Sequence, residues 1–262
     1  MIDVQHLTKK FHDFVAVDDI SFHVNKGEIF AFLGPNGAGK STTIKMLTTL
    51  LRPSSGTLRL GAHDPVAHPE QARRIFGIVF QDPSLDDELT AYENMDFHGM
   101  LYDVPKKERR EKIEQLLTFV DLWDRKDSFV KEFSGGMKRR LEIARGLLHH
   151  PEVIFLDEPT LGLDPQTRNH MWDYLRHLNK TEGTTVFFTT HYLEEADRVA
   201  ERIAIIDHGK MIGIGTSAEL KEQTGTHTLE EAFLSLTGKT IREESSSSTD
   251  RLRSMRRMWI KK

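Results

Sequence analysis

The 262-residue sequence contains no cysteine, no long apolar run and no strong excess of either charge. Without cysteine the chain can form neither disulfides nor thiolate metal sites, which excludes a secreted disulfide scaffold and permits a reducing compartment. No stretch approaches the roughly 18 consecutive apolar residues of a membrane-spanning helix, and residues 1–10 lack the apolar core of a signal peptide, so we expect the chain itself to be soluble. The net charge of −4 argues against nucleic-acid binding through bulk electrostatics, although a local basic patch is compatible with it.

A glycine-rich run at residues 34–41 matches the phosphate-binding loop G-x-x-x-x-G-K-[ST] in full. It follows a short apolar run at 28–33, typical of a strand, and precedes apolar residues at helical spacing over 41–51. In such a loop the glycines let backbone N–H groups approach phosphate oxygens, the lysine supplies a cation for the β and γ phosphates, and the serine hydroxyl can bind Mg²⁺. A glycine-rich turn without a ligand is the alternative. The motif predicts a nucleoside triphosphate site formed by Gly34, Pro35, Asn36, Gly37, Ala38, Gly39, Lys40, Ser41 and Thr42.

Strand-type runs that alternate with helical patterns predict an α/β fold with a parallel sheet and right-handed crossovers. Residues 1–30 combine short strands with turn signals, which predicts a small antiparallel sheet at the start of the chain. A hairpin turn is expected at 207–210, and Thr216 is expected to cap a last short helix. The strands expected after the loop lie at 57–61, 75–80, 153–156, 185–190 and 203–206, and two of the helices at 166–178 and 193–201.

Helical spacing dominates between residues 82 and 150, most clearly over 107–120, and predicts a helical insertion. Residues 241–262 are expected to form a disordered basic tail, because apolar residues are absent from its first part. Basic and apolar residues alternate over 251–262, which would suit an anionic membrane surface, and a solubilising tail is the alternative. We expect one domain over 1–240, divided into a core of 1–81 and 151–215, a helical subdomain of 82–150 and a C-terminal hairpin with helix over 203–240.

Two adjacent carboxylates, Asp157 and Glu158, directly follow the apolar strand-type run at 153–156. Ligands of parallel sheets bind at the carboxyl ends of the strands. In a phosphoryl-transfer site Asp157 would hold the Mg²⁺ shell, and Glu158 would polarise the attacking water as general base. A buried strand that runs into a polar turn is the alternative, and the phosphate loop earlier in the chain favours the functional interpretation.

Other short motifs in the sequence match the set of motifs that one known protein family shares. The run Ser134-Gly135-Gly136, followed by a long helical pattern, resembles the signature motif of the ATP-binding cassette (ABC) ATPases, and the phosphate loop and the carboxylate pair resemble the nucleotide site of that family. The resemblance covers residues 2–238. It implies a P-loop NTPase of the ABC type, with a parallel-sheet core, an N-terminal antiparallel β subdomain and an inserted α-helical subdomain. The remaining matches are a glutamine loop at Gln81, an aspartate loop that ends at Asp164, a switch histidine at His191 and an adenine-stacking aromatic at Phe11.

The resemblance implies that the chain binds ATP with Mg²⁺ and hydrolyses it. It further implies that two ATP molecules lie between two chains, in a homodimer or in a pair with a related ATPase. The catalytic residues that it implies are Glu158, His191 and Gln81. The implied ligands of the metal ion are Ser41, Gln81 and Asp157. Ser134, Gly135 and Gly136 would contact the γ-phosphate of the ATP that the opposite subunit holds.

Met137 stands where the commonest family signature has Gln, and with the basic residues that follow it resembles the drug-resistance branch of the family. ATPases of this branch pair with separate membrane subunits of the ABC-2 type, so the resemblance implies export of a drug-like or lipid-like substrate through such a permease. The chain would then be a peripheral protein, held by the permease at the cytoplasmic face of the cell membrane, with no nucleic-acid partner. The alternatives are a soluble ABC ATPase that acts on ribosomes or DNA, and a small-molecule kinase, which would leave residues 134–136 and His191 unexplained.

Several of these positions also have a plainer interpretation. Phe11 would also suit an apolar core, with Phe14 as the rival stacking residue. Gln81 would also suit a polar strand end, and His191 the start of a helix. The acidic residues over 82–88 predict a solvated loop rather than a cation site, and His149-His150 are expected at the surface because no metal-ligand spacing surrounds them.

Three cations, Lys138, Arg139 and Arg140, occupy the expected first turn of the helix after the signature run. Cations there oppose the helix dipole by about 0.3–1 kcal/mol each when exposed, so a negative partner is expected nearby. One candidate is a γ-phosphate docked at this helix start. The other is the pair of carboxylates at Glu132 and Glu142, which would screen the cations within the chain itself.

Overall fold

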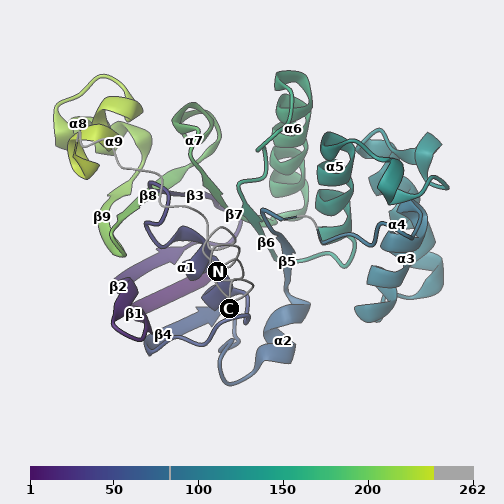
Figure 1. The fold of residues 1–262 in the computed structure, drawn as a ribbon, viewed down its shortest axis with the longest axis horizontal. Helices are drawn as coiled ribbons and strands as arrows, with labels where there is room; N and C mark the ends of the chain where they lie inside the picture. The colour runs from purple at the N-terminus through teal and green to yellow at the C-terminus, as the bar shows by residue number, and fades with distance from the viewer. Residues whose placement is uncertain (83, 239–262) are drawn as a thin grey trace, which may run out of the picture.

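The structure, a computed structural model, describes residues 1–82 and 84–238. The tail predicted at 241–262 therefore lies outside the described residues. Two sheets and the helices packed around them make up this part of the chain (Figure 1). Within it, none of the helices combines the length and the apolar character needed to cross a bilayer.

An antiparallel sheet with the strand order β2-β1-β4 opens the chain. Its strands span Ile2–Phe11 (β1), Phe14–Val24 (β2) and Ser55–Leu60 (β4). The antiparallel sheet expected at the start of the chain is confirmed, and its third strand comes from beyond the phosphate loop. Buried and exposed residues alternate toward the end of β2, as in a sheet with one covered face.

Six strands of the described residues form a second sheet, in the order β5-β6-β7-β3-β8-β9. All neighbours pair in parallel except β8 and β9, so the predicted parallel sheet is confirmed, with an antiparallel strand at one edge. Because β3, β6 and β7 point the same way, their carboxyl ends meet at one edge of the sheet. Their bounds are Ile29–Leu33 (β3), Phe76–Val79 (β5), Val153–Asp157 (β6), Thr185–Thr190 (β7), Arg202–Asp207 (β8) and Lys210–Gly215 (β9).

Apolar side chains cover both faces of the parallel sheet, which is why its central strands are buried along their whole length. On one face Phe22 of the antiparallel sheet lies 5.6 Å from the ring of Phe32, and helix α1 (Lys40–Leu47) adds the buried Ile44. On the other face Trp172 of helix α6 (Pro165–Glu182) is fully buried and packs on Phe188 at 4.6 Å. The central strands are therefore held in place by a packed apolar layer on each face of the parallel sheet.

Helices replace strands between β5 and β6, as the sequence predicts. Three α-helices of the described residues lie together beside α6 at one end of the molecule, α3 (Ala91–Leu101), α4 (Lys106–Phe119) and α5 (Gly135–Gly146), with 3₁₀ turns at Trp123–Arg125 (η1) and Val130–Glu132 (η2) (Figure 1). The helix expected over 107–120 is α4, and its apolar stripe at Ile113, Leu116 and Leu117 is buried. The division into subdomains with the stated boundaries stays a prediction.

The remaining elements follow the sequence less closely. α1 ends at Leu47 rather than near residue 51, because Thr49 takes a left-handed φ of 65° and the N–H of Leu50 turns back to the carbonyl of Lys45 at 2.9 Å. The hairpin turn between β8 and β9 and the cap at Thr216 are confirmed. The other helices are α2 (Pro69–Arg74) and α9 (Leu229–Thr237), which the sequence did not predict, and α7 (Leu193–Val199) and α8 (Ser217–Thr224), which it did.

Candidate nucleotide site

The phosphate loop joins the carboxyl end of β3 to α1, and two of its glycines lie where no side chain fits. A Cβ at Gly34 would lie 2.4 Å from the carbonyl oxygen of Ile206, and one at Gly39 would lie 2.6 Å from that of Ala16. Gly39 also has a φ of 111°, and as the residue before α1 it offers no side-chain cap to the helix. The first N–H groups of α1 are therefore left without a capping side chain, which is the arrangement that binds anions at a helix start.

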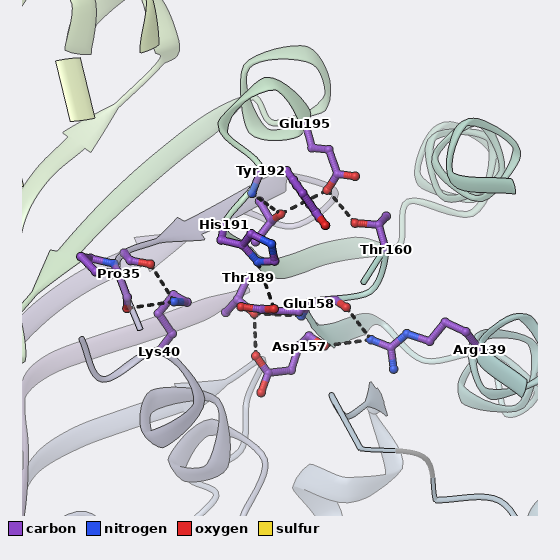
Figure 2. Close-up of polar contacts among 12 residues, drawn as sticks. Pro35, Lys40, Arg139, Asp157, Glu158, Thr160, Thr189, His191, Tyr192 and Glu195 are labelled. Atoms are coloured by element: carbon purple, nitrogen blue, oxygen red, sulfur yellow. Dashed lines mark hydrogen bonds and ion pairs between the residues drawn. The ribbon is translucent and has the colours of Figure 1, made fainter. Parts of the chain in front are cut away.

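Lys40 is buried within this loop, with 6% of its surface exposed. Its ammonium donates hydrogen bonds to the carbonyl oxygens of Gly34 at 2.7 Å and Pro35 at 3.1 Å. Burial lowers the pKa of Lys40, and the nearby charges of Glu158 and Asp157 act in the opposite direction. The loop thus holds a cation that faces the two carboxylates from across the strand ends (Figure 2).

The two carboxylates lie at the end of β6, and Thr189 of the neighbouring strand β7 fixes both. The Thr189 hydroxyl donates to Oδ1 of the buried Asp157 at 2.6 Å. The backbone N–H of Glu158 points to the hydroxyl oxygen of Thr189 at 3.0 Å and to its carbonyl oxygen at 3.2 Å. Glu158 has a left-handed φ of 49°, an uncommon conformation for a residue with a side chain. Sequence reasoning did not identify Thr189.

His191 follows β7 and meets Glu158 from the opposite side. Its Nδ1 lies 3.1 Å from Oε2 of Glu158, and the Glu158 side chain is only 11% exposed. These two predicted residues are 33 positions apart in the sequence and meet because β6 and β7 are neighbours. The structure therefore brings the predicted base and the predicted switch histidine into direct contact, beside Asp157 and Lys40 (Figure 2).

The other predicted residues lie further from this group. Gln81 is exposed just after β5. Ser134 is exposed and caps α5, where its hydroxyl oxygen accepts the N–H of Met137 at 3.3 Å. Asp164 is exposed and caps α6, and hydrogen bonds from Thr167 lower its pKa.

Phe11 is not a core residue, so that interpretation is wrong. It is 42% exposed at the end of β1 and pairs across the hairpin with Phe14, which is 63% exposed. The ammonium of Lys9 lies 5.0 Å from the centre of the Phe11 ring. Both aromatic rings are therefore available at the surface.

The cations of the signature helix, for which a negative partner was expected nearby, each have a partner within the described chain. Lys138 pairs with Asp87 at 2.6 Å, and Arg140 donates to the carbonyl of Val120 at 2.7 Å. Arg139 is buried and lies 3.3 Å from Glu142, so the carboxylate alternative is confirmed for that pair. Its other bonds go to backbone carbonyls beside the site.

A second residue that the sequence analysis missed is Glu195 on α7, which is 4% exposed. Its Oε2 accepts hydrogen bonds from the hydroxyls of Thr160 at 2.9 Å and Thr190 at 3.2 Å, and its Oε1 lies 3.3 Å from Arg168. Thr160 follows Glu158 by two positions and Thr190 precedes His191. A buried carboxylate therefore braces the segments on both sides of the Glu158–His191 contact (Figure 2).

The donors assigned to Mg²⁺ are a hydroxyl (Ser41), an amide (Gln81) and a carboxylate (Asp157). Oxygen donors of this kind fit Mg²⁺, which binds through one or two carboxylates together with substrate phosphates. Over residues 1–82 and 84–238 no group of three His, Cys, Asp or Glu residues could hold a metal ion. In the acidic loop over 82–88, Asp87 pairs with Lys138 and Glu88 pairs with Lys131.

His149 is not a surface residue as expected. Its ring stacks on Tyr102 at 3.8 Å, its Nε2 lies 3.0 Å from the carbonyl oxygen of Phe76, and burial lowers its pKa to about 4. His98 packs in the same cluster, and burial lowers its pKa to about 3.

Comparison with known proteins agrees with this geometry. The ABC transporter family matches residues 17–161. The chain is 46% identical over 228 residues to the daunorubicin/doxorubicin resistance ATP-binding protein DrrA of Streptomyces peucetius, which covers 87% of this chain and 69% of the relative. It is 42% identical over 229 residues to the linearmycin resistance ATP-binding protein LnrL of Bacillus subtilis (strain 168), which covers 87% of this chain and 73% of the relative.

Solved structures give the same result. A structure of an ATP-binding subunit of an ABC transporter superposes with a TM-score of 0.85 at 31% identity, over 90% of this chain and 99% of the other. A dimeric ATP-binding cassette in a post-hydrolysis state, bound to ADP and Pi, superposes with a TM-score of 0.75 at 28% identity, over 82% of this chain and 98% of the other. The chain therefore belongs to the ABC transporter family, and it is an ABC ATPase.

Proposed function

We propose that this ABC ATPase energises export of a drug-like or lipid-like substrate through a separate ABC-2-type membrane permease. The observation that carries the ATPase half is the contact between Glu158 and His191 beside Asp157 and the phosphate loop. The export half is supported by relatives whose names include resistance to daunorubicin, doxorubicin and linearmycin. A Nod factor export ATP-binding protein of Burkholderia thailandensis is also 42% identical over 221 residues, which cover 84% of this chain and 72% of the relative.

In the proposed site the phosphate loop grips the polyphosphate of ATP. The N–H groups at the start of α1 would face the phosphate oxygens, and the ammonium of Lys40 would exchange its bonds to the Gly34 and Pro35 carbonyls for β- and γ-phosphate oxygens. Phe11 would stack on adenine, because its ring is exposed at the β1–β2 hairpin end of the antiparallel sheet. The proposed binding residues of the loop are Gly34, Pro35, Asn36, Gly37, Ala38, Gly39, Lys40, Ser41 and Thr42.

Hydrolysis then needs a base and a group that orients it. Glu158 would take the proton of the attacking water while the water oxygen bonds to the γ-phosphorus and ADP leaves with the electron pair. His191, bonded to Oε2 of Glu158, would orient that carboxylate toward the γ-phosphate. Mg²⁺, held by Ser41, Gln81 and Asp157, would supply charge neutralisation on the phosphate oxygens.

A second cassette would complete the site. The start of α5 carries Ser134, Gly135 and Gly136 at the surface or close to it, and no Cβ-sized obstacle surrounds Gly135. We propose that these residues, with Asp164, bind the ATP that is held by the phosphate loop of the opposite subunit, in a homodimer or in a pair with a related ATPase. The dimeric cassette among the structural neighbours supports this arrangement.

The permease would hold the chain as a peripheral protein at the cytoplasmic face of the cell membrane. An ABC ATPase acting on ribosomes or DNA is not favoured, because the net charge is −4, the sequence has one phosphate loop, and the relatives are named for resistance and export. We therefore propose no nucleic-acid partner.

Two measurements test the proposal. Lys40→Ala should abolish MgATP binding and phosphate release, because it removes the buried cation of the loop. An ATPase activity equal to that of the unaltered chain would contradict the assignment. The second is purification from detergent-solubilised membranes of cells that express a tagged chain, where an ABC-2-type membrane protein should be recovered with it, and recovery of ribosomes or DNA instead would contradict the export half.

A further inference from the structure

Arg139 joins the signature helix to two other segments of the nucleotide site. Its side chain leaves α5 one turn after Ser134 and is buried, with 7% of the residue exposed. Nη2 donates to the carbonyl oxygens of Asp157 at 2.8 Å and Glu158 at 2.9 Å. Nε donates to the carbonyl oxygen of Pro159 at 2.9 Å, and Nη1 donates to that of Phe80. One guanidinium thus bonds three consecutive residues of the carboxylate turn and the residue before Gln81. Figure 2 shows its bonds to Asp157 and Glu158.

The charge of this guanidinium is balanced by Glu142, one helical turn along α5 and 2% exposed, at 3.3 Å. The same carboxylate accepts the backbone N–H of Ser84 at 2.6 Å. Arg139 and Glu142 therefore fix the segment around Gln81 at two points, the carbonyl before it and the N–H of Ser84. A buried cation with this set of acceptors has no need of an external anion.

The bond to Glu158 falls on a residue with strained backbone. Glu158 has a left-handed φ of 49°, which persists only where the surroundings hold it. Thr189 holds its N–H on one side and Arg139 holds its carbonyl on the other. Release of the carbonyl would let the backbone relax, and the direction of the Glu158 side chain would change with it.

We propose that Arg139 is a positioning residue for hydrolysis, which ties the backbone of Glu158 and the Phe80–Gln81 junction to the signature helix. The inference rests on the proposed role of Glu158 as the base. Because Arg139 contacts the backbone behind the carboxylate and none of the phosphate-loop residues, its loss should affect turnover far more than ATP binding.

The test compares kcat, KM for ATP and the thermal unfolding midpoint of the unaltered chain with those of Arg139→Gln, Arg139→Lys and Arg140→Gln. Arg139→Gln should lower kcat by about 10- to 100-fold, as expected when bonds from a charged group are lost, with KM within threefold of the original. Arg139→Lys keeps the positive charge but lacks the planar guanidinium with its several N–H donors. Its kcat should lie between that of the unaltered chain and that of Arg139→Gln. Arg140→Gln is the matched control, since Arg140 bonds Val120 away from the carboxylates, and its kcat should stay within twofold.

A kcat of Arg139→Gln within threefold of the original would overturn the inference, and so would a loss of kcat matched by an equal rise in KM. If Arg139→Gln does not fold, the lysine variant decides, because an unaltered kcat in Arg139→Lys overturns the inference and a reduced kcat at unaltered KM supports it. Failure of the proposed function shows separately. In that case the unaltered chain and its Lys40→Ala variant would release phosphate at the same rate.

Discussion

The clearest test of the site geometry is Thr189→Val, which keeps the shape of the side chain and removes its hydroxyl. That hydroxyl makes the one side-chain hydrogen bond that Asp157 has within the described residues, and it also accepts the N–H of Glu158. Loss of a hydrogen bond to a buried charged group costs about 1.5–3 kcal/mol, and 1 kcal/mol shifts the unfolding midpoint of a chain of this size by about 2–4 °C. We therefore expect Tm to fall by about 3–12 °C.

The same change should lower kcat by about 10- to 100-fold, because misplaced catalytic groups lose their alignment. Thermal unfolding followed by circular dichroism and steady-state phosphate release measure the two effects. Thr189→Ser retains the hydroxyl and should keep most of the activity. Thr181→Val, which removes a hydroxyl bonded to the carbonyl of His177 on the exposed side of α6, is the matched control and should leave kcat unchanged. If Thr189→Val matched the unaltered chain in both Tm and kcat, the hydroxyl would not fix the carboxylates and the reasoning would fail.

Three further predictions follow from the site and its supports. Glu158→Gln should retain ATP binding and accumulate an ATP-bound dimer on size-exclusion chromatography, and undiminished hydrolysis would remove Glu158 from the role of base. Gly39→Ala should lower both Tm and ATP affinity, because the added Cβ meets the Ala16 carbonyl at 2.6 Å, and unchanged nucleotide titrations would refute this. The pKa values of His98 and His149, about 3 and 4, lie below the ordinary 6.5, so the stability from these neutral rings is fully present above pH 6.5 and is lost as the pH falls toward 4 and 3. Between pH 7 and pH 5 the loss of folding stability from each histidine is at most about 2 kcal/mol. The double variant His98→Phe/His149→Phe should therefore flatten the pH dependence of the urea midpoint, whereas the control His177→Phe, at an exposed position, should not. Equal pH slopes in the unaltered chain and the double variant would contradict the assignment.

The sequence was sufficient for those parts of the site whose chemistry is local. The phosphate loop, the carboxylate pair and His191 each consist of particular residue types next to a strand, and parallel pairing of β3, β6 and β7 then places them at one edge. The strands themselves were predictable because burial on both faces leaves continuous apolar runs.

The residues that support the site were not predictable in the same way. Arg139 bonds backbone carbonyls 18 to 59 positions away, and backbone carbonyls leave no mark in a sequence. The first-turn charge argument applies to exposed cations, and Arg139 is buried and paired with Glu142. Thr189 lay within the strand expected at 185–190 and Glu195 within the helix expected at 193–201, and neither was given a role in the site. A carboxylate in the first turn of the helix after His191 was the available signal for Glu195.

The strand order β6-β7-β3 has a mechanical consequence. The phosphate loop follows β3 and the carboxylate turn follows β6, and both strands are hydrogen-bonded to β7. Neither loop can therefore move relative to the other without breaking the hydrogen-bond ladder of these central strands, which are buried on both faces of the sheet. The strands that carry the nucleotide-binding loops therefore form a rigid support when ATP is exchanged for ADP. Helices α3 and α4 lie outside this ladder, and we expect a displacement that accompanies turnover to occur there rather than between the two loops that hold the nucleotide.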